Sequence, residues 1–343
     1  MVLLIFYTMA KKKKINIIQN YEKYTKTHIA LNTTFWFVGL ILVFIIWWIL
    51  SATLNTGKFV FPTIGNTFKG IGMILGGQSM QYISPLLPAA AQQTTAFMVG
   101  QEWAALGIAL GQAVFTFVAA YILVAICVYL THVFKPMRYL FAPFVTYIRT
   151  LPAAIIMCII SLLFAGQHNV WIIPIIVTYC IIFPVLYGSL QDAFSQRSLK
   201  RIEMARVYGM NKWQIFSKII IKEMTPYIFS SLVTGFGLTF KVIVASQLVA
   251  ISICQINPNY PSIGWMIGLA INALNTVKLP VQTALISGII LGWGLITIFV
   301  SLIFELAFKG LGWLCMPWTH KKYHSPEPKK RIIIRKHKEE RAR

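Results

Sequence analysis

The sequence predicts an all-α membrane protein with about six transmembrane helices. Hydrophobic residues make up 57% of the chain and charged residues only 12%, whereas soluble domains carry about 25% charged residues. The stretch from Thr150 to Gln191 contains no Asp, Glu, Lys or Arg, and it is about twice as long as the roughly 20 residues that cross a bilayer as a helix. Basic residues gather in alternate connecting segments, which is typical of a multi-pass membrane protein.

Long apolar stretches define the expected spans. They lie at 34–52, 104–130, 139–165, 170–190, 227–253 and 280–308. The third and fourth spans are expected to be separated by a turn at the polar residues 166–169, because loop backbone is costly inside lipid. The last five spans form the expected helical core, 104–308.

The loop between the first two spans, 53–103, is longer than an ordinary connection. It is expected on the external side, with an amphipathic segment near 64–76. Its second half, 77–100, is expected to act as a spacer.

The positions of Lys and Arg predict the orientation of the chain. They concentrate in the N-terminal segment 1–33, in the loop 197–226 and in the C-terminal tail 309–343. By the positive-inside rule, both termini and this loop are expected on the cytoplasmic side of the cell membrane. The net charge is +22, and the basic tail is expected to lie beside anionic lipid. No nucleic acid is expected as a partner, although RNA binding by the tail is an alternative.

The loop 197–226 is charged, yet it carries a pattern. The apolar residues Trp213, Phe216 and Ile220 recur with the spacing of one helix face. The loop is therefore expected to be helical and folded.

A turn is expected within this loop. Gly209 suits the end of a first helix, because glycine adopts the left-handed conformation without a side-chain penalty. Asn211 and Gln214 have capping-box spacing for a second helix. The sequence thus predicts a helix, a tight turn and a second helix, and one interpretation is an amphipathic pair lying on the lipid surface.

The same loop resembles the EAA loop of ATP-binding cassette importer permeases. The resemblance lies in "EMARVYG" followed by "MNKWQIFSKII", with matching residues at Glu203, Ala205, Gly209, Ile219 and Ile221. Met204 and Lys222 depart from the family's pattern of a second alanine and a proline.

Three further segments resemble the nitrate, sulfonate and taurine-type permeases. They are "FVFPTIGNTFKGIGMIL" at 59–75, "YIRTLPAAIIMCIISLLF" at 147–164 and "SIGWMIGLAIN" at 262–272. The resemblance covers most of residues 59–310 and implies the fold of a type I importer permease.

This resemblance implies how the chain works with partners. In such permeases the EAA loop inserts into a groove of a cytoplasmic ATPase, with a second permease copy and an external solute-binding protein completing the importer. The residues expected to couple to the ATPase are Glu203, Ala205, Arg206, Gly209, Asn211, Trp213 and Phe216. ATP is expected to bind to the separate ATPase subunit, so the chain itself is expected to need no cofactor.

Two cations lie inside apolar spans. Placing an ionised side chain at the centre of a bilayer costs at least about 2.5–3.5 kcal/mol of free energy. Arg149 and Lys241 are therefore expected to face a pore, a partner or an interface. With Gln247 they are candidates for the translocation pathway, and cations along it favour an anionic solute such as a sulfonate or nitrate. The alternative is that both cations snorkel or bind carbonyl groups in helix packing.

No motif for chemistry is present, because the chain lacks a phosphate-binding loop, a His-Glu-x-x-His element and a nucleophile elbow. The protein is therefore expected not to be an enzyme, and neither a metal nor a disulfide role is expected for its scattered cysteines. Two alternatives to the importer are an ion-coupled secondary transporter, which needs no ATPase, and a membrane scaffold that acts through its basic tail.

Overall fold

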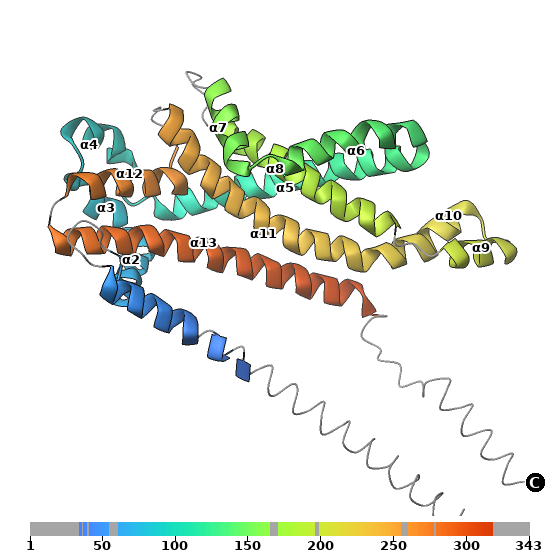
Figure 1. The fold of residues 1–343 in the computed structure, drawn as a ribbon, viewed down its shortest axis with the longest axis horizontal. Coiled ribbons are helices and arrows are strands. Elements are labelled where there is room, and N and C mark those ends of the chain that lie inside the picture. The colour runs from blue at the N-terminus through green and yellow to red at the C-terminus, as the bar shows by residue number, and fades with distance from the viewer. Residues whose placement is uncertain are drawn as a thin grey trace, which may run out of the picture.

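The computed structural model describes residues 34–35, 37–39, 41–54, 61–164, 171–195, 199–254, 260–277 and 279–317. The described residues form helices joined by short connections and contain no strand (Figure 1). The expected all-α fold is confirmed. The segment 1–33, the turn expected at 166–169 and the tail beyond 317 lie outside the described residues.

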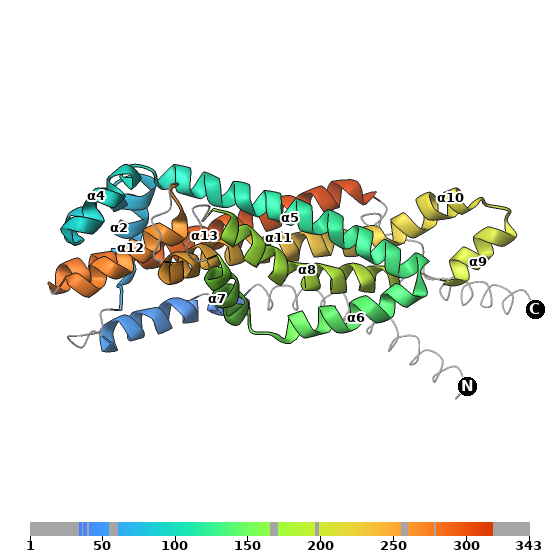
Figure 2. The same ribbon diagram turned by 90° about the horizontal axis from the view of Figure 1, so that it is seen from above.

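Four helices are long and apolar enough to cross a membrane. They are α5 (Glu102–Val133), α8 (Ile172–Ser195), α11 (Ile221–Cys254) and α13 (Pro280–Cys315). All four run along the long axis of the molecule (Figures 1 and 2). A helix satisfies its backbone polar groups internally, which is the requirement that lipid imposes on a spanning segment. These helices match the second, fourth, fifth and sixth expected spans.

The third expected span, 139–165, is not one straight helix. It is divided into α6 (Lys135–Thr150) and α7 (Ala153–Leu163), which meet at a bend of 97°. Pro152 lies at the break, where its ring disfavours helical backbone at the preceding residue, Leu151. The described residues therefore contain four spans, or five when this bent pair counts as one.

The first expected span, 34–52, corresponds to the apolar helix Phe37–Thr53, which is shorter than the four long helices and includes residues outside the described part. The Trp47 indole Nε1 donates to the Pro62 carbonyl, at 3.0 Å.

The amphipathic helix expected near 64–76 is confirmed as α2 (Ile64–Leu75). The Thr63 hydroxyl caps it by accepting from the Asn66 N–H. α2 crosses α13 where two glycines meet, since a Cβ at Gly70 would lie 2.6 Å from the backbone of Gly288. This contact brings the two helix backbones together.

The segment 77–100, expected to act as a spacer, is largely helical. Residues 79–98 form α3 (Ser79–Ile83), α4 (Ala89–Thr95) and two 3-10 turns (Ser84–Leu86, Ala96–Met98). Glu102, which is 2% exposed, fixes them to α5, because its Oε1 accepts from the Ser79 hydroxyl at 2.8 Å and from the Met80 N–H at 3.0 Å. The loop is thus a packed helical cap, with a buried carboxylate in place of an exposed linker.

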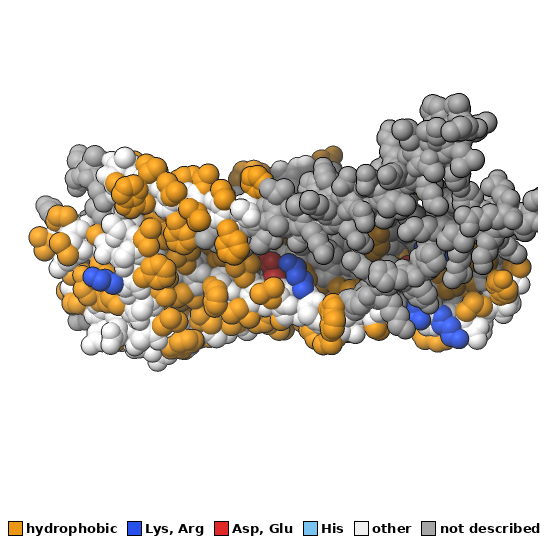
Figure 3. Space-filling view, turned by 90° about the horizontal axis from the view of Figure 1, so that it is seen from below, with side chains coloured by type: hydrophobic (Ala, Val, Ile, Leu, Met, Phe, Trp, Pro, Cys, Tyr) orange, Lys and Arg blue, Asp and Glu red, His pale blue; other side chains and the backbone are white. Residues whose placement is uncertain are grey.

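Between α11 and α13 lies the short helix α12 (Ile263–Thr276), whose first turn is capped by the Ser262 hydroxyl. Aromatic rings pack between α5, α11 and α13. The ring of Phe236 on α11 lies 4.7 Å from that of Phe304 on α13 in a tilted arrangement, and it meets the ring of Phe117 on α5 edge-on at 5.5 Å. Figure 3 shows one face of the molecule, where hydrophobic side chains are spread over the described surface and an acidic side chain lies beside a basic one near the middle.

Candidate functional site

The charged loop forms a helical hairpin at one end of the molecule. It consists of α9 (Leu199–Val207) and α10 (Lys212–Ile215), and the π-helical segment η3 (Phe216–Ile220) joins α10 to α11. Both ribbon views show α9 and α10 projecting together beyond the long helices (Figures 1 and 2). The expected helix, turn and helix are confirmed, and we call α9, α10 and η3 the hairpin.

Gly209 ends α9 with a φ of 72°, a conformation that costs little only for glycine. The Gly209 N–H donates to the Arg206 carbonyl at 2.9 Å, and the Met210 N–H donates to the Ala205 carbonyl at 3.1 Å. These two bonds are the Schellman arrangement that satisfies the last carbonyls of a helix. The helix end expected at Gly209 is confirmed.

The start of α10 is also held as expected. The Asn211 N–H donates to the Gln214 side-chain oxygen at 3.1 Å, which is the capping-box bond predicted from their spacing. The next turn widens into η3, and π-helical turns are frequent at functional sites. The chain therefore passes from the hairpin into α11 without a flexible linker.

Several apolar side chains are exposed on the hairpin. Trp213 is 72% exposed, and its ring lies 5.8 Å from that of the less exposed Phe216. The sequence did not single out Val207 and Tyr208, which are 86% and 80% exposed. No periodicity could identify them, because they lie at the turn itself.

The other residues expected to act in coupling fall into two groups. Glu203, Arg206 and Asn211 are exposed, whereas Ala205 is buried at 4% exposure. Ala205 therefore packs inside the hairpin, whereas Met204 beside it is exposed.

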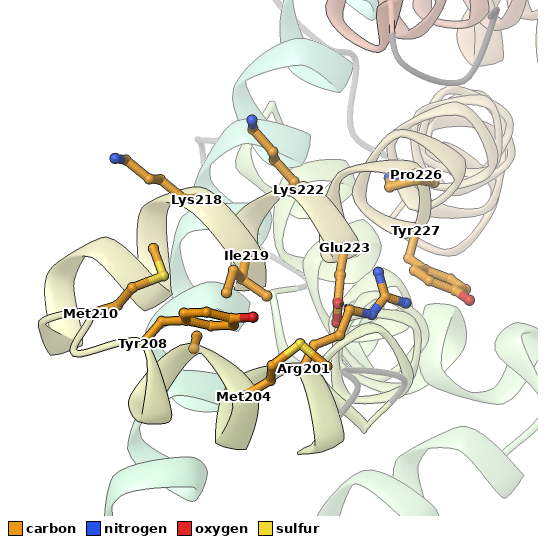
Figure 4. A pocket seen from close by; sticks show the side chains of 11 residues that line it. Arg201, Met204, Tyr208, Met210, Lys218, Ile219, Lys222, Glu223, Pro226 and Tyr227 are labelled. Carbon is orange, nitrogen blue, oxygen red and sulfur yellow. Dashed lines mark ion pairs between the residues drawn. The ribbon is translucent and has the colours of Figure 1, made fainter. Parts of the chain in front are cut away.

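A hollow of about 650 Å³ separates α9 from the start of α11. Figure 4 shows Arg201, Met204 and Tyr208 rising from α9 toward Ile219 and Glu223. The ammonium ends of Lys218 and Lys222 point away from α9 in the same view. The hollow is thus bounded by apolar groups, with charges around its rim.

One ion pair bridges this hollow. The Arg201 Nε lies 2.9 Å from the Glu223 Oε1, and the side chains are 67% and 13% exposed. Because Glu223 belongs to the first turn of α11, the pair connects α9 directly to a membrane-spanning helix. The sequence does not predict this contact, because no local pattern links Arg201 to Glu223.

The three pathway candidates occupy different surroundings. Arg149 is exposed at the last turn of α6, where its guanidinium passes over Gly188 of α8. Lys241 is exposed midway along α11, whereas Gln247 is only 1% exposed. Within the described residues no hydrogen bond or ion pair joins these three side chains.

Gln247 belongs to a buried hydrogen-bond network. Its Nε2 donates to the Gln112 Oε1 at 2.7 Å, and its Oε1 accepts from the Gly264 N–H at 3.2 Å. Gln112 also donates to the Trp171 carbonyl. Tyr260 hydrogen-bonds to Gln112, and burial raises the pKa of Tyr260 to about 12, so its hydroxyl keeps its proton at neutral pH. The network holds α5, α8, α11 and α12 together.

Comparison with known proteins identifies the family. The family of binding-protein-dependent transport system inner membrane components matches residues 122–311. This match covers more than half of the chain, begins within α5, ends within α13 and includes the whole hairpin. No curated protein matches the chain. The fold, the hairpin and this match together show that the chain belongs to the binding-protein-dependent transport system inner membrane component family, the permeases of ATP-binding cassette importers.

Proposed function

We propose that this permease carries a small solute across the membrane and is driven by cytoplasmic ATPases that bind its hairpin. Family membership implies ATP-binding cassette ATPase subunits and a solute-binding protein as partners. The observation that carries the proposal is the exposed apolar surface of the hairpin, held in place by the Gly209 turn. Exposed aromatic residues of this kind supply much of the free energy of protein interfaces.

The proposed contact combines burial with charge. Covering a large apolar side chain such as Trp213 stabilises a complex by about 1.5–3 kcal/mol. Glu203 and Arg206, both exposed on α9, add orientation, because charged pairs at the rim of an interface set register more than affinity. An ATPase groove with an apolar floor and charges of both signs at its edge fits this surface.

The hairpin is proposed to pass motion to the membrane in two ways. η3 continues directly into α11, and the Arg201–Glu223 ion pair ties α9 to the same helix. When ATP binding closes the ATPases, the hairpins of two permease copies move together and α11 moves with them. Hydrolysis then returns the pair to its first state.

The orientation follows from the same proposal. The hairpin and both termini lie on the cytoplasmic side, and the helical cap at 64–98 lies outside, where a solute-binding protein docks. The exposed cations Arg149 and Lys241 support a solute that carries negative charge, of the sulfonate or nitrate kind. Gln247, buried in its network, positions helices and does not contact the solute.

Co-purification tests the ATPase proposal. Glu203→Arg is expected to lower the amount of ATPase that co-purifies with the detergent-solubilised protein by at least about tenfold, because it reverses a charge on the docking surface. Asp192→Arg is the matched control, since Asp192 is also an exposed carboxylate at this end of the molecule. An ATPase that never accompanies the wild-type protein overturns the proposal, provided that gel filtration shows a folded permease.

A further inference from the structure

The exposed residues of α11 form a single narrow stripe. Between Met224 and Ala250 they are Tyr227, Ser230, Thr234, Leu238 and Lys241. Their spacing of three and four residues places them on one face of the helix. Four of the five carry a hydroxyl or an ammonium group.

The lipid-facing surface of the same molecule is different. The large exposed residues along the middle of α5 are apolar, namely Val114, Phe115, Val118, Ile122, Leu123 and Ile126. Polar side chains within a membrane face a bundle interior or a water-filled cavity, because lipid offers them no hydrogen bonds. The stripe on α11 is therefore expected to face water and not lipid.

A cavity of about 400 Å³ lies beside this stripe, between α11 and α13. Its polar lining comes from Ser230 and Thr234 of α11 and from Glu305 and Lys309 of α13. Pro226, which also borders the hollow of the hairpin, lines its end. The cavity thus lies at the hairpin end of the membrane-spanning helices.

The carboxylate of Glu305 lies against a glycine of the neighbouring helix, Gly237. A Cβ at Gly237 would lie 2.7 Å from the Glu305 Oε1 and 3.1 Å from the Ser301 Oγ. The absence of a side chain at this position of α11 lets the carboxylate lie against the helix backbone. Gly237 therefore leaves room for the charged side chain of Glu305 between α11 and α13.

The charges around the cavity have opposite signs and stay apart. Lys309 is one helical turn from Glu305 on α13, and both line the cavity. Glu305 and Lys309 form no ion pair with any residue of the described part of the chain. Charges inside a membrane protein need a partner, and a ligand between these groups would supply one.

We propose that this cavity is a solute-binding station on the translocation pathway. It takes a small organic solute that carries both an anionic group and a cationic or hydrogen-bond-donating group. Lys309 attracts the anionic group, Glu305 accepts the donor, and the hydroxyls of Ser230 and Thr234 replace water around the solute. A simple inorganic anion would leave the Glu305 carboxylate without a partner. This inference rests on the proposed function and narrows its solute class.

Accessibility of introduced cysteines tests the inference. The full chain, with its five native cysteines replaced, receives Ser230→Cys or Thr234→Cys. Leu302→Cys and Leu306→Cys are the controls, because both residues are exposed on α13 beside Glu305 and carry apolar side chains. Unsealed membranes are treated with methanethiosulfonates that bear either a trimethylammonium or a sulfonate group.

The cysteines on the stripe are expected to react at least about tenfold faster than the controls. At Thr234→Cys, Glu305→Gln is expected to lower the rate ratio of the cationic to the anionic reagent by about threefold or more, and Lys309→Gln is expected to raise it. Rates equal to those of the controls overturn the inference, and so does a rate ratio that neither substitution changes.

Co-purification of the ATPase from the same membranes separates this inference from the function on which it rests. If the cysteines on the stripe react slowly while the ATPase still co-purifies, only the proposal of a solute-binding cavity is rejected. Fast labelling from a wild-type protein that never binds an ATPase rejects the importer, and with it the role of the cavity in transport.

Discussion

Gly288→Leu is expected to be among the most destabilising substitutions in this protein. A Cβ at Gly288 would lie 2.4 Å from the Asn66 carbonyl oxygen and 2.7 Å from its carbon. These atoms belong to the backbone of α2, so they cannot move aside as a flexible side chain does. Overpacking typically costs about 1–3 kcal/mol, and we expect the upper end here, with the thermal midpoint lowered by on the order of 5–10 °C.

Thermal unfolding of the detergent-purified protein measures this effect. Gly294→Leu is the control, because Gly294 lies on the same helix and no atom would come within 4 Å of its Cβ. It is expected to leave the midpoint unchanged. Equal midpoints for the two variants would show that α2 does not pack on α13 as described.

Reversing either charge of the Arg201–Glu223 pair is expected to break the contact between α9 and α11. Exposed ion pairs contribute little, about 0–1 kcal/mol, but Glu223 is largely shielded at 13% exposure. Arg201→Glu would place two carboxylates where an ion pair 2.9 Å long now stands. We expect α9 to swing away from α11 and ATP hydrolysis by the purified complex to fall at least about tenfold.

The exchanged pair distinguishes this role from a general need for either residue. A double variant with Arg201→Glu and Glu223→Arg is expected to recover most of the hydrolysis, because attraction across the hollow returns. A double variant as inactive as the single ones would argue that the two residues act separately. Thermal midpoints, measured in parallel, should stay within a few degrees of the wild type.

Local signals explain which features the sequence could predict. The long spans could be predicted because lipid requires uninterrupted apolar helices. The turn at Gly209 and the bond between Asn211 and Gln214 could be predicted because each depends on residues only a few positions apart. The break at Pro152 had a signal as well, yet the apolar composition on both sides favoured one continuous span.

The remaining features depend on contacts between distant segments. Gly70 meets Gly288 only because α2 folds back across the last helix. Arg201 reaches Glu223 only once the hairpin has closed. No periodicity in the sequence predicts such pairs. The contact between the buried carboxylate of Glu102 and Ser79, which holds the segment 79–98 against α5, is likewise not predictable from a local pattern.

Site-specific photo-cross-linking at position 213 tests the central claim most directly. Benzoylphenylalanine in place of Trp213, in the full chain within its native membrane, is expected to cross-link to an ATP-binding cassette ATPase. In place of Trp313, which is 60% exposed near the end of α13, it should give no such product. Cross-links from position 213 only to lipid would contradict the account, because the hairpin would then lie on the membrane surface and drive nothing.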